Sequence, residues 1–225
     1  MTRVAIIAAM PGELKPLVRH WQTEPRDSVH LWHHRIEGGE WAAACAGAGV
    51  GAAARAFAEI EHDGPVDAII STGWAGALTG ELQTGQAYSV AGVIDARTGE
   101  RFPPSSRSGG LWLVTSPKVA NEREKQRLAA TYGASLVDME AAAIARIAQM
   151  RGVPFYCVKG ISDGYKDQLP DFNRFLLPDG RFRLAGFVLF ALIRPWHWPA
   201  LIRMGENSKR AAQSIAESLL QILHQ

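Results

Sequence analysis

Short apolar runs of strand length alternate along the chain with longer segments in which apolar residues recur at helical spacing. The first run, residues 3–9, is dominated by Val, Ile and Ala, which is typical of a buried strand. The pattern predicts strands at 3–9, 66–72, 85–96, 111–116, 135–139 and 154–162, and helices at 12–21, 51–64, 121–133 and 140–152. This alternation predicts an α/β fold with the sheet at its centre.

A hairpin changes the expected sheet. Residues 29–37 and 40–47 read as two strands joined at Gly38-Gly39, which makes the sheet mixed. A Gly, Pro and Ser-rich loop is predicted at 97–110. Because neither a repeat nor a linker interrupts the 225 residues, we expect one domain, 1–225, with three layers: a central mixed β-sheet flanked by helices.

The composition narrows the class of protein. With 47% hydrophobic and 20% charged residues, the chain is typical of a soluble globular protein. The net charge of +2 and the lack of a Lys/Arg run argue against a nucleic-acid partner. The first run lacks the layout of a secretory signal. Cys45 and Cys157 lie far apart in sequence, so we expect reduced, buried thiols and a cytoplasmic protein.

Two acids stand at the ends of apolar runs, without an obvious basic partner beside either of them. Asp163 follows the strand predicted at 154–162, and ligands of α/β folds collect at that edge of the sheet. Half desolvated, it is expected to stay protonated and to act as a general acid. Glu140 opens a helix, where a carboxylate can accept hydrogen bonds from a vicinal diol. The alternative is structural: Glu140 stabilises the helix N-terminus and Asp163 caps a loop at Gly164.

Two further motifs suggest cofactors, and neither is specific. Residues 47–51, GAGVG, do not match GxGxxG, and Asp67 precedes the next strand where a ribose-binding acid should follow it, so no nicotinamide cofactor is expected. On a strand, His30 and His34 share one face and His33 points away, with no acid or cysteine adjacent. We therefore predict an exposed hairpin face and no metal site.

Five segments, taken in order, resemble motifs of the nucleoside phosphorylase superfamily, and especially of methylthioadenosine/S-adenosylhomocysteine nucleosidases. They are VAIIAAMPGEL (4–14), CAGAGVGAAARA (45–56), DAIISTGWAGAL (67–78), LVDMEAAAIA (136–145) and VKGISDG (158–164). The resemblance implies a nucleoside phosphorylase-like fold, a purine nucleoside as the small-molecule partner, no cofactor and a homodimer.

The resemblance also implies roles for individual residues. Met139 and Glu140 match the pair that holds the ribose, with Glu140 on the 2′ and 3′ hydroxyls. Asp163 matches the acid that protonates purine N7, and Ser162 matches the residue that positions it. Glu13 matches the acid that activates the attacking water.

Other matches concern the walls of the site. Val119 and Ala120 fall where the family packs the purine, although an aromatic residue is usual there. Phe172 matches the aromatic side chain of the 5′ pocket. Gly73 and Trp74 belong to the central turn that binds substrate, and Trp74 replaces a small serine.

The implied reaction is cleavage of the N-glycosidic bond of an adenine nucleoside, with a substituent expected at its 5′ position. Hydrolysis is favoured because no arginine stands in the first loop or before the central turn, although Arg55 and Lys159 remain candidates for an anion contact. Two alternatives stay open. One is a phosphate-dependent phosphorylase, including a hopanoid-associated type acting on an adenosylated lipid. The other is a non-catalytic nucleoside sensor, against which the joint presence of the three acids argues.

The segment 182–212 is far more apolar than a typical tail of this family. Its run from Leu184 to Ile193 is too short to span a bilayer. We favour a core or dimer-interface helix. The other hypothesis is an apolar lid or a peripheral membrane contact through Trp196, Trp198 and flanking arginines.

Overall fold

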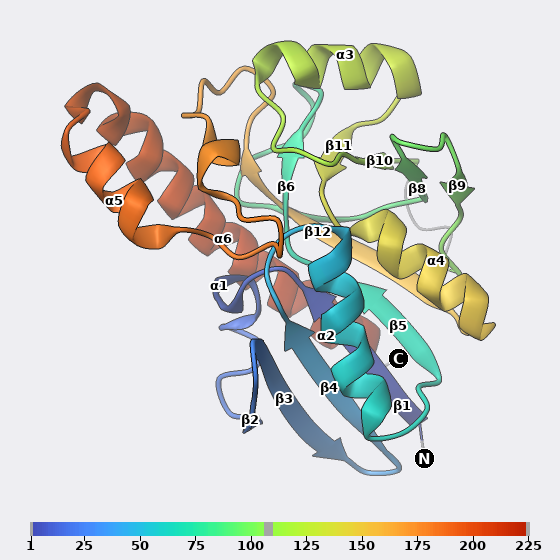
Figure 1. Ribbon diagram of the computed structural model, residues 1–225. Coiled ribbons are helices and arrows are strands. Elements are labelled where there is room, and N and C mark those ends of the chain that lie inside the picture. Colours follow the sequence, from blue (N-terminus) through green and yellow to red (C-terminus); the bar gives the residue numbers. More distant parts are fainter. Residues whose placement is uncertain (1, 106–109, 224–225) are drawn as a thin grey trace.

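A mixed β-sheet runs through the whole molecule (Figure 1). The computed structural model describes residues 2–105 and 110–223. In these residues the strand order is β2 (Gln22–Arg26), β3 (Val29–Ile36), β4 (Gly39–Cys45), β1 (Thr2–Ala8), β5 (Ala68–Ser71), β12 (Phe155–Asp163), β6 (Trp74–Ala77), β11 (Leu136–Asp138), β10 (Trp112–Thr115), β8 (Gly92–Asp95) and β9 (Arg101–Phe102), while β7 (Ala87–Ser89) pairs with β12.

The central strands are parallel. β4, β1, β5, β12 and β6 form a continuous parallel set, so their carboxyl ends lie at one edge. β11 is antiparallel to β6, which brings the carboxyl end of β11 to the start of β6. The chain segments that follow β1, β5 and β11 therefore meet beside the turn between β5 and β6, and this is where a site can form.

Helices cover both faces of the sheet, as the sequence predicts. α2 (Val50–His62) and α4 (Ala141–Arg151) pack on one face, and α6 (Trp198–Leu223) packs with the short α1 (Pro11–Leu14) on the other. α3 (Glu122–Tyr132) covers the end formed by β10 and β11. The expected α/β fold with a central mixed sheet flanked by helices is confirmed. Cys45 and Cys157 are both free and buried.

Four predictions are wrong in detail. The helix predicted at 12–21 ends at Leu14, and turns follow, because Pro16 has no N–H to continue the ladder. The segment 22–26, predicted as no element, is the edge strand β2. The strand predicted at 85–96 is two strands, β7 and β8, with different partners. The loop predicted at 97–110 contains β9, and its residues 106–109 lie outside the described chain.

Candidate active site

A cavity of about 850 Å³ lies beside the β5–β6 turn, within the usual size of small-molecule sites. Its polar end is formed by the segments after the parallel strands, and its other end is apolar. The sequence-predicted residues in its wall are Glu13, Trp74, Val119, Ala120, Met139, Glu140, Ser162, Asp163 and Phe172. Gly73 is not among the described wall residues, and its predicted contact with substrate stays a prediction.

Glu13 is held on α1 by the backbone. Its Oε2 accepts hydrogen bonds from the N–H groups of Ala9 and Met10, and its Oε1 accepts one from Trp74, each at 2.8 Å. Burial raises the pKa of Glu13 above its ordinary value, although these N–H groups and Lys159 act against the rise. A carboxylate has about four acceptor positions. One position on Oε1 therefore remains for a water molecule.

Gly73 supports Glu13 from behind. Its φ of +117° lies in a region that side chains rarely adopt, and a Cβ there would come 2.9 Å from both carboxylate oxygens of Glu13. The adjacent Trp74 lies in the cavity wall, and its indole N–H donates to the Ser208 carbonyl of α6 at 2.9 Å. The central turn thus fixes Glu13 and joins it to the C-terminal helix.

Glu140 is the N-cap residue of α4, but its side chain makes no capping hydrogen bond. The first free N–H groups of α4 are satisfied by neighbours: Ala141 N–H donates to Asp138 Oδ2 and Ala142 N–H to Thr115 Oγ1, both at 2.9 Å. Glu140 instead accepts from the N–H of Gly49 at 2.6 Å. The structural alternative for Glu140 therefore has no capping hydrogen bond to support it.

Burying the carboxyl group of Glu140 costs this fold stability. It is 8% exposed, and burial, with the nearby charge of Asp138, raises the pKa of Glu140 to about 8, although Lys159 and the Gly49 N–H act in the other direction. A group kept at such a cost is expected at a functional site. The Gly49 contact also assigns a role to the segment 45–56, because the main chain of that segment orients the Glu140 carboxylate.

Lys159 and Arg55 were expected as candidates for an anion contact. Neither presents an unpaired cation to the cavity. Lys159 is fully buried, and its Nζ contacts Asp138 Oδ2 at 2.9 Å and the Thr72 carbonyl at 2.8 Å. Burial acts to lower the pKa of Lys159, but Asp138, Cys157 and Glu140 together outweigh it and raise that pKa. Arg55 donates to the carbonyls of Ala46 and Asp179. Both side chains are engaged in hydrogen bonds or ion pairs within the protein.

Asp163 ends β12 at an irregularity. The register of β12 against β6 shifts between Ile161 and Asp163, and such bulges re-aim side chains beside active sites. Ser162 lies within the shift, and its hydroxyl donates to Asp163 Oδ1 at 2.7 Å. The positioning role that the resemblance implies for Ser162 therefore has a geometric basis.

Asp163 also has a basic partner, which corrects the sequence prediction. The Nζ of Lys125 forms an ion pair with Asp163 Oδ2 and donates to the Gly164 carbonyl at 2.6 Å. Lys125 is 2% exposed and lines the same cavity. A Cβ on Gly76 would lie 3.0 Å from Asp163 Oδ2 and 3.2 Å from Lys125 Cε. Gly76 therefore provides the space in which the two side chains meet.

Sequence reasoning missed Lys125 because α3 reads as a charged surface helix. A signal was present: Lys125 stands three and seven residues before Leu128 and Tyr132, the apolar positions that turn toward the sheet. A lysine on the buried stripe of a helix needs a carboxylate inside the protein. Asp163 is that carboxylate.

The side chain of Asn173 is hydrogen-bonded to the wall segment that was expected to hold the purine. Asn173 Oδ1 accepts from the N–H of Val119 at 2.8 Å, and its Nδ2 donates to the Val119 carbonyl at 3.0 Å. The main chain of Val119 is thus bonded to Asn173, and the predicted packing of Val119 against a purine stays a prediction. Ala120 is buried in the same wall. Asn173 was not predicted from the sequence.

The far end of the cavity is aromatic and aliphatic. Phe172 stacks obliquely with Phe182 and Phe187, at ring-centroid distances of 6.4 and 5.5 Å. Leu169, Leu176, Leu184, Leu201 and Met204 continue this surface. An apolar chain fits this end better than a charged group does.

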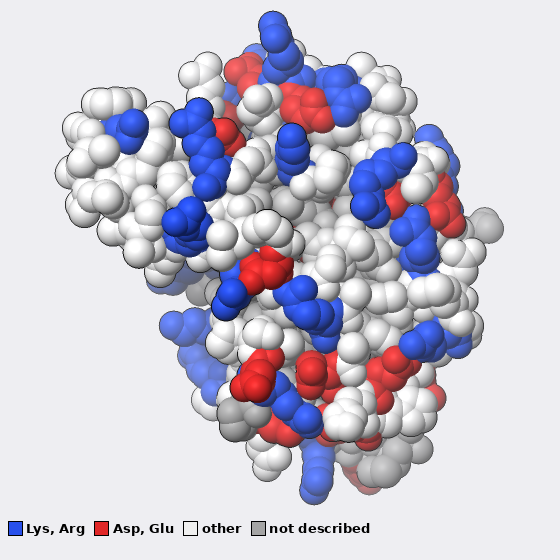
Figure 2. All heavy atoms as spheres, viewed as in Figure 1, with Lys and Arg blue, Asp and Glu red and all other residues white. Residues whose placement is uncertain are grey.

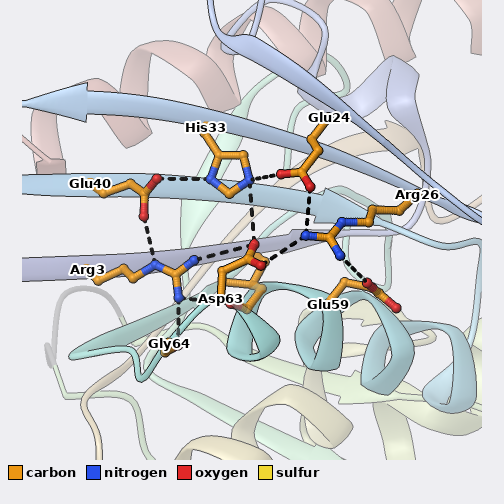
Figure 3. A network of polar contacts seen from close by, with 9 residues as sticks. Arg3, Glu24, Arg26, His33, Glu40, Glu59, Asp63 and Gly64 are labelled. Atoms are coloured by element: carbon orange, nitrogen blue, oxygen red, sulfur yellow. Dashed lines mark hydrogen bonds and ion pairs between the residues drawn. The ribbon is translucent and has the colours of Figure 1, made fainter.

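A second polar cluster lies away from the cavity, on the β2 side of the sheet (Figure 3). His33 is only half-buried, and its Nδ1 lies 3.0 Å from Glu40 Oε1 and its Nε2 3.2 Å from Glu24 Oε2. The expected exposed face without acids is therefore wrong for His33, because acids distant in sequence surround it.

Three groups of this cluster, from Glu24, His33 and Asp63, lie close enough together to hold a metal ion. Arg26 already contacts both carboxylates, Glu24 Oε1 at 2.7 Å and Asp63 Oδ1 at 2.9 Å. A bound cation would compete with this arginine. The cluster is explained as a structural tie between the hairpin and α2.

Comparisons with known proteins agree with this geometry. Among curated proteins, none matches the sequence. Solved structures match over nearly the whole chain. The 5′-methylthioadenosine/S-adenosylhomocysteine nucleosidase of Helicobacter pylori has a TM-score of 0.74 at 16% identity, covering 99% of this chain and 98% of that one. The futalosine hydrolase of the same organism has a TM-score of 0.76 at 15% identity, covering 99% and 97%.

The S-adenosylhomocysteine nucleosidase of Streptococcus pyogenes has a TM-score of 0.73 at 20% identity, covering 99% and 96%. At these identities the likeness shows a shared fold. The model of one protein family, described as the phosphorylase superfamily, matches residues 3–107 and 96–186. Because these matches span most of the sequence, the chain belongs to the phosphorylase superfamily.

Proposed function

We propose that this protein hydrolyses the N-glycosidic bond of an adenine nucleoside that carries an apolar 5′ substituent. The observation that carries the proposal is the placement of Glu13, Glu140 and the Lys125–Asp163 pair around one cavity with an apolar far end. Hydrolysis of such a bond needs a base for water, a hold on the sugar and an acid for the departing purine.

The departing purine takes its proton from the Lys125–Asp163 pair. As the bond between the sugar and N9 breaks, both bonding electrons go to the base, and N7 gains basicity. Asp163 delivers a proton to N7, and Lys125 supplies that proton through the contact between the two side chains. The purine leaves neutral, with Lys125 as a neutral amine that water reprotonates. General-acid catalysis of this kind contributes about 10²–10⁴-fold in rate.

Glu140 holds the sugar and acts in its ionised form, which its pKa of about 8 makes the minor form of the free protein near neutral pH. Two hydroxyls of a ribose can donate to its carboxylate, and the negative charge stabilises the cationic sugar as the bond breaks. The Gly49 N–H fixes the carboxylate for this purpose. Met139, beside it in the cavity wall, packs against the sugar.

Glu13 activates the nucleophile. The remaining acceptor position on its Oε1 takes a proton from water as the oxygen bonds to the sugar C1′. A phosphate dianion in the same place would meet this carboxylate, with Lys159 and Arg55 already engaged elsewhere. Two like charges about 4 Å apart at an effective dielectric of about 20 repel by roughly 4 kcal/mol. These contacts support water over phosphate.

The proposal is tested by measuring free adenine released from a panel of nucleosides: adenosine, 5′-methylthioadenosine and 5′-alkylthio homologues of increasing chain length. We expect release from the wild type, rising in kcat/KM with chain length, and none from Asp163→Asn. Binding without release from every member would favour the sensor hypothesis. The family resemblance supports a homodimer, which sedimentation velocity would test.

A further inference from the structure

The apolar hairpin, residues 184–203, projects from the body of the molecule (Figure 1). It consists of α5 (Leu184–Leu192), the short η2 (Pro195–His197) and the first part of α6. Trp198 fixes the bend, because its indole N–H donates to the Ala191 carbonyl at 2.8 Å. None of the nine residues of α5 is buried. Most of this apolar helix is therefore exposed, although Phe187 and Phe190 contact Phe175.

The large apolar side chains that this hairpin exposes form most of those exposed in the described chain. They are Leu184, Val188, Leu189, Leu192, Ile193, Trp196, Trp198 and Ile202, between 45% and 68% exposed. Soluble monomers rarely expose a large contiguous apolar surface unless something binds there. Two of these residues are tryptophans, which prefer the boundary between hydrocarbon and water.

The charges on the hairpin itself are positive. Between residues 180 and 205 the sequence contains Arg181, Arg183, Arg194 and Arg203 and neither Asp nor Glu, although Arg181 is paired with Asp179 and Glu206 follows directly. The lobe at the upper left of Figure 2 is accordingly mainly white with blue atoms on it. Apolar side chains with arginines beside them are complementary to an anionic lipid surface. A second copy of the hairpin would bring like charges together.

The hairpin is placed to lie on a bilayer and not to cross it. No single helix among residues 2–105 and 110–223 is long and apolar enough to cross a membrane, and α5 with the stretch Pro195–Leu223 meets that test only as a pair bent by 103°. The second half of α6 is committed to the sheet: a Cβ on Gly160 of β12 would lie 2.9 Å from Ala211 Cβ. That half cannot leave without opening the core.

The hairpin is also continuous with the cavity. Leu184, Phe187, Leu201 and Met204 line its apolar end, while Leu189 and Leu192 on the same hairpin face outward. The exposed apolar surface of the hairpin and the apolar wall of the cavity therefore belong to the same segment.

We propose that the apolar hairpin docks the protein on anionic lipid bilayers. It inserts Leu189, Leu192 and Trp196 at the interface, and the cavity receives the nucleoside head of a molecule whose 5′ chain is anchored in the bilayer. The part that concerns the substrate rests on the proposed nucleosidase function, whereas the docking does not.

The test is flotation of the purified protein with vesicles of phosphatidylglycerol and phosphatidylcholine, compared with vesicles of phosphatidylcholine alone. We expect flotation with the anionic vesicles, weakened by salt. Leu189→Ser/Leu192→Ser should weaken binding roughly 100-fold or more, since each leucine loses a buried position. Arg183→Gln/Arg203→Gln should weaken it roughly 25-fold, at about fivefold for each arginine.

Met150→Ser is the matched control, because Met150 on α4 is 65% exposed and distant in sequence from the hairpin, against 62% for Leu189. It should float like the wild type, and all variants should release adenine from 5′-methylthioadenosine at the wild-type rate. Wild-type protein that releases adenine but does not float would overturn the docking and leave the proposed function standing. Dissociation of an oligomer by Leu189→Ser/Leu192→Ser, without flotation of the wild type, would assign the hairpin to a second copy and also overturn it.

Discussion

Replacing Glu140 by glutamine should make the fold more stable near neutral pH and impair function. The ordinary pKa of a glutamate is 4.5, and burial with the charge of Asp138 raises that of Glu140 to about 8. Between these two values the folded protein keeps a proton that the unfolded chain releases. The contribution of Glu140 to stability is therefore complete below pH 4.5 and is lost as the pH rises toward 8. Glutamine, which does not titrate, has no such loss.

The size of the effect follows from the linkage of one proton. Each pH unit between the two pKa values changes the free energy of unfolding by about 1.36 kcal/mol. From about pH 5 to about pH 7 the wild type should thus lose about 2.7 kcal/mol that Glu140→Gln keeps. The carboxamide oxygen can still accept the Gly49 N–H, so the contact that orients the side chain is retained.

Urea unfolding of the wild type and of Glu140→Gln at these two pH values measures the difference. Titrating groups distant from Glu140 contribute equally to both proteins and cancel. Glu81→Gln is the control, because Glu81 is exposed, and its two unfolding energies should follow those of the wild type. Equal pH dependence in wild type and Glu140→Gln would refute the argument that this carboxylate is kept at a cost for function.

The other predictions concern turnover. Asp163→Asn should abolish adenine release while circular dichroism shows an intact fold; activity within a few-fold of wild type would remove Asp163 from the acid role. Lys125→Met should lower kcat by about 100-fold and destabilise the protein, because Asp163 loses its partner. Adding Asp163→Asn should restore stability but not activity, and a purely structural lysine would not show this split. Glu140→Gln should cost ribonucleosides about 1.5–3 kcal/mol more in kcat/KM than 2′-deoxynucleosides; equal losses would separate Glu140 from the diol.

Much of the fold was predictable because apolar runs and helical periods are local properties of the sequence. The edge strand β2 was not predicted, because Gln22–Arg26 is polar and is a strand only through its pairing with β3. The helix predicted at 12–21 was too long, because its apolar spacing continues past Pro16, which has no N–H for the helical ladder.

The acids of the site were predicted by motif, but their partners were not. Lys125 lies 38 residues before Asp163, and Asn173 lies 54 residues after Val119. Such contacts depend on how loops and helices pack, which no local pattern contains. The acids around His33 were missed for the same reason: Asp63 reaches it from α2's C-terminal end.

The central claim, that water directed by Glu13 is the nucleophile, is tested most directly by the sugar product. Purified enzyme is incubated with 5′-methylthioadenosine in phosphate-free buffer and in phosphate, and the sugar is identified by mass spectrometry. The account predicts the free 5′-methylthioribose at the same rate in both buffers, and no product with Glu13→Gln. Turnover that requires phosphate and yields the sugar 1-phosphate would contradict it and make the protein a phosphorylase.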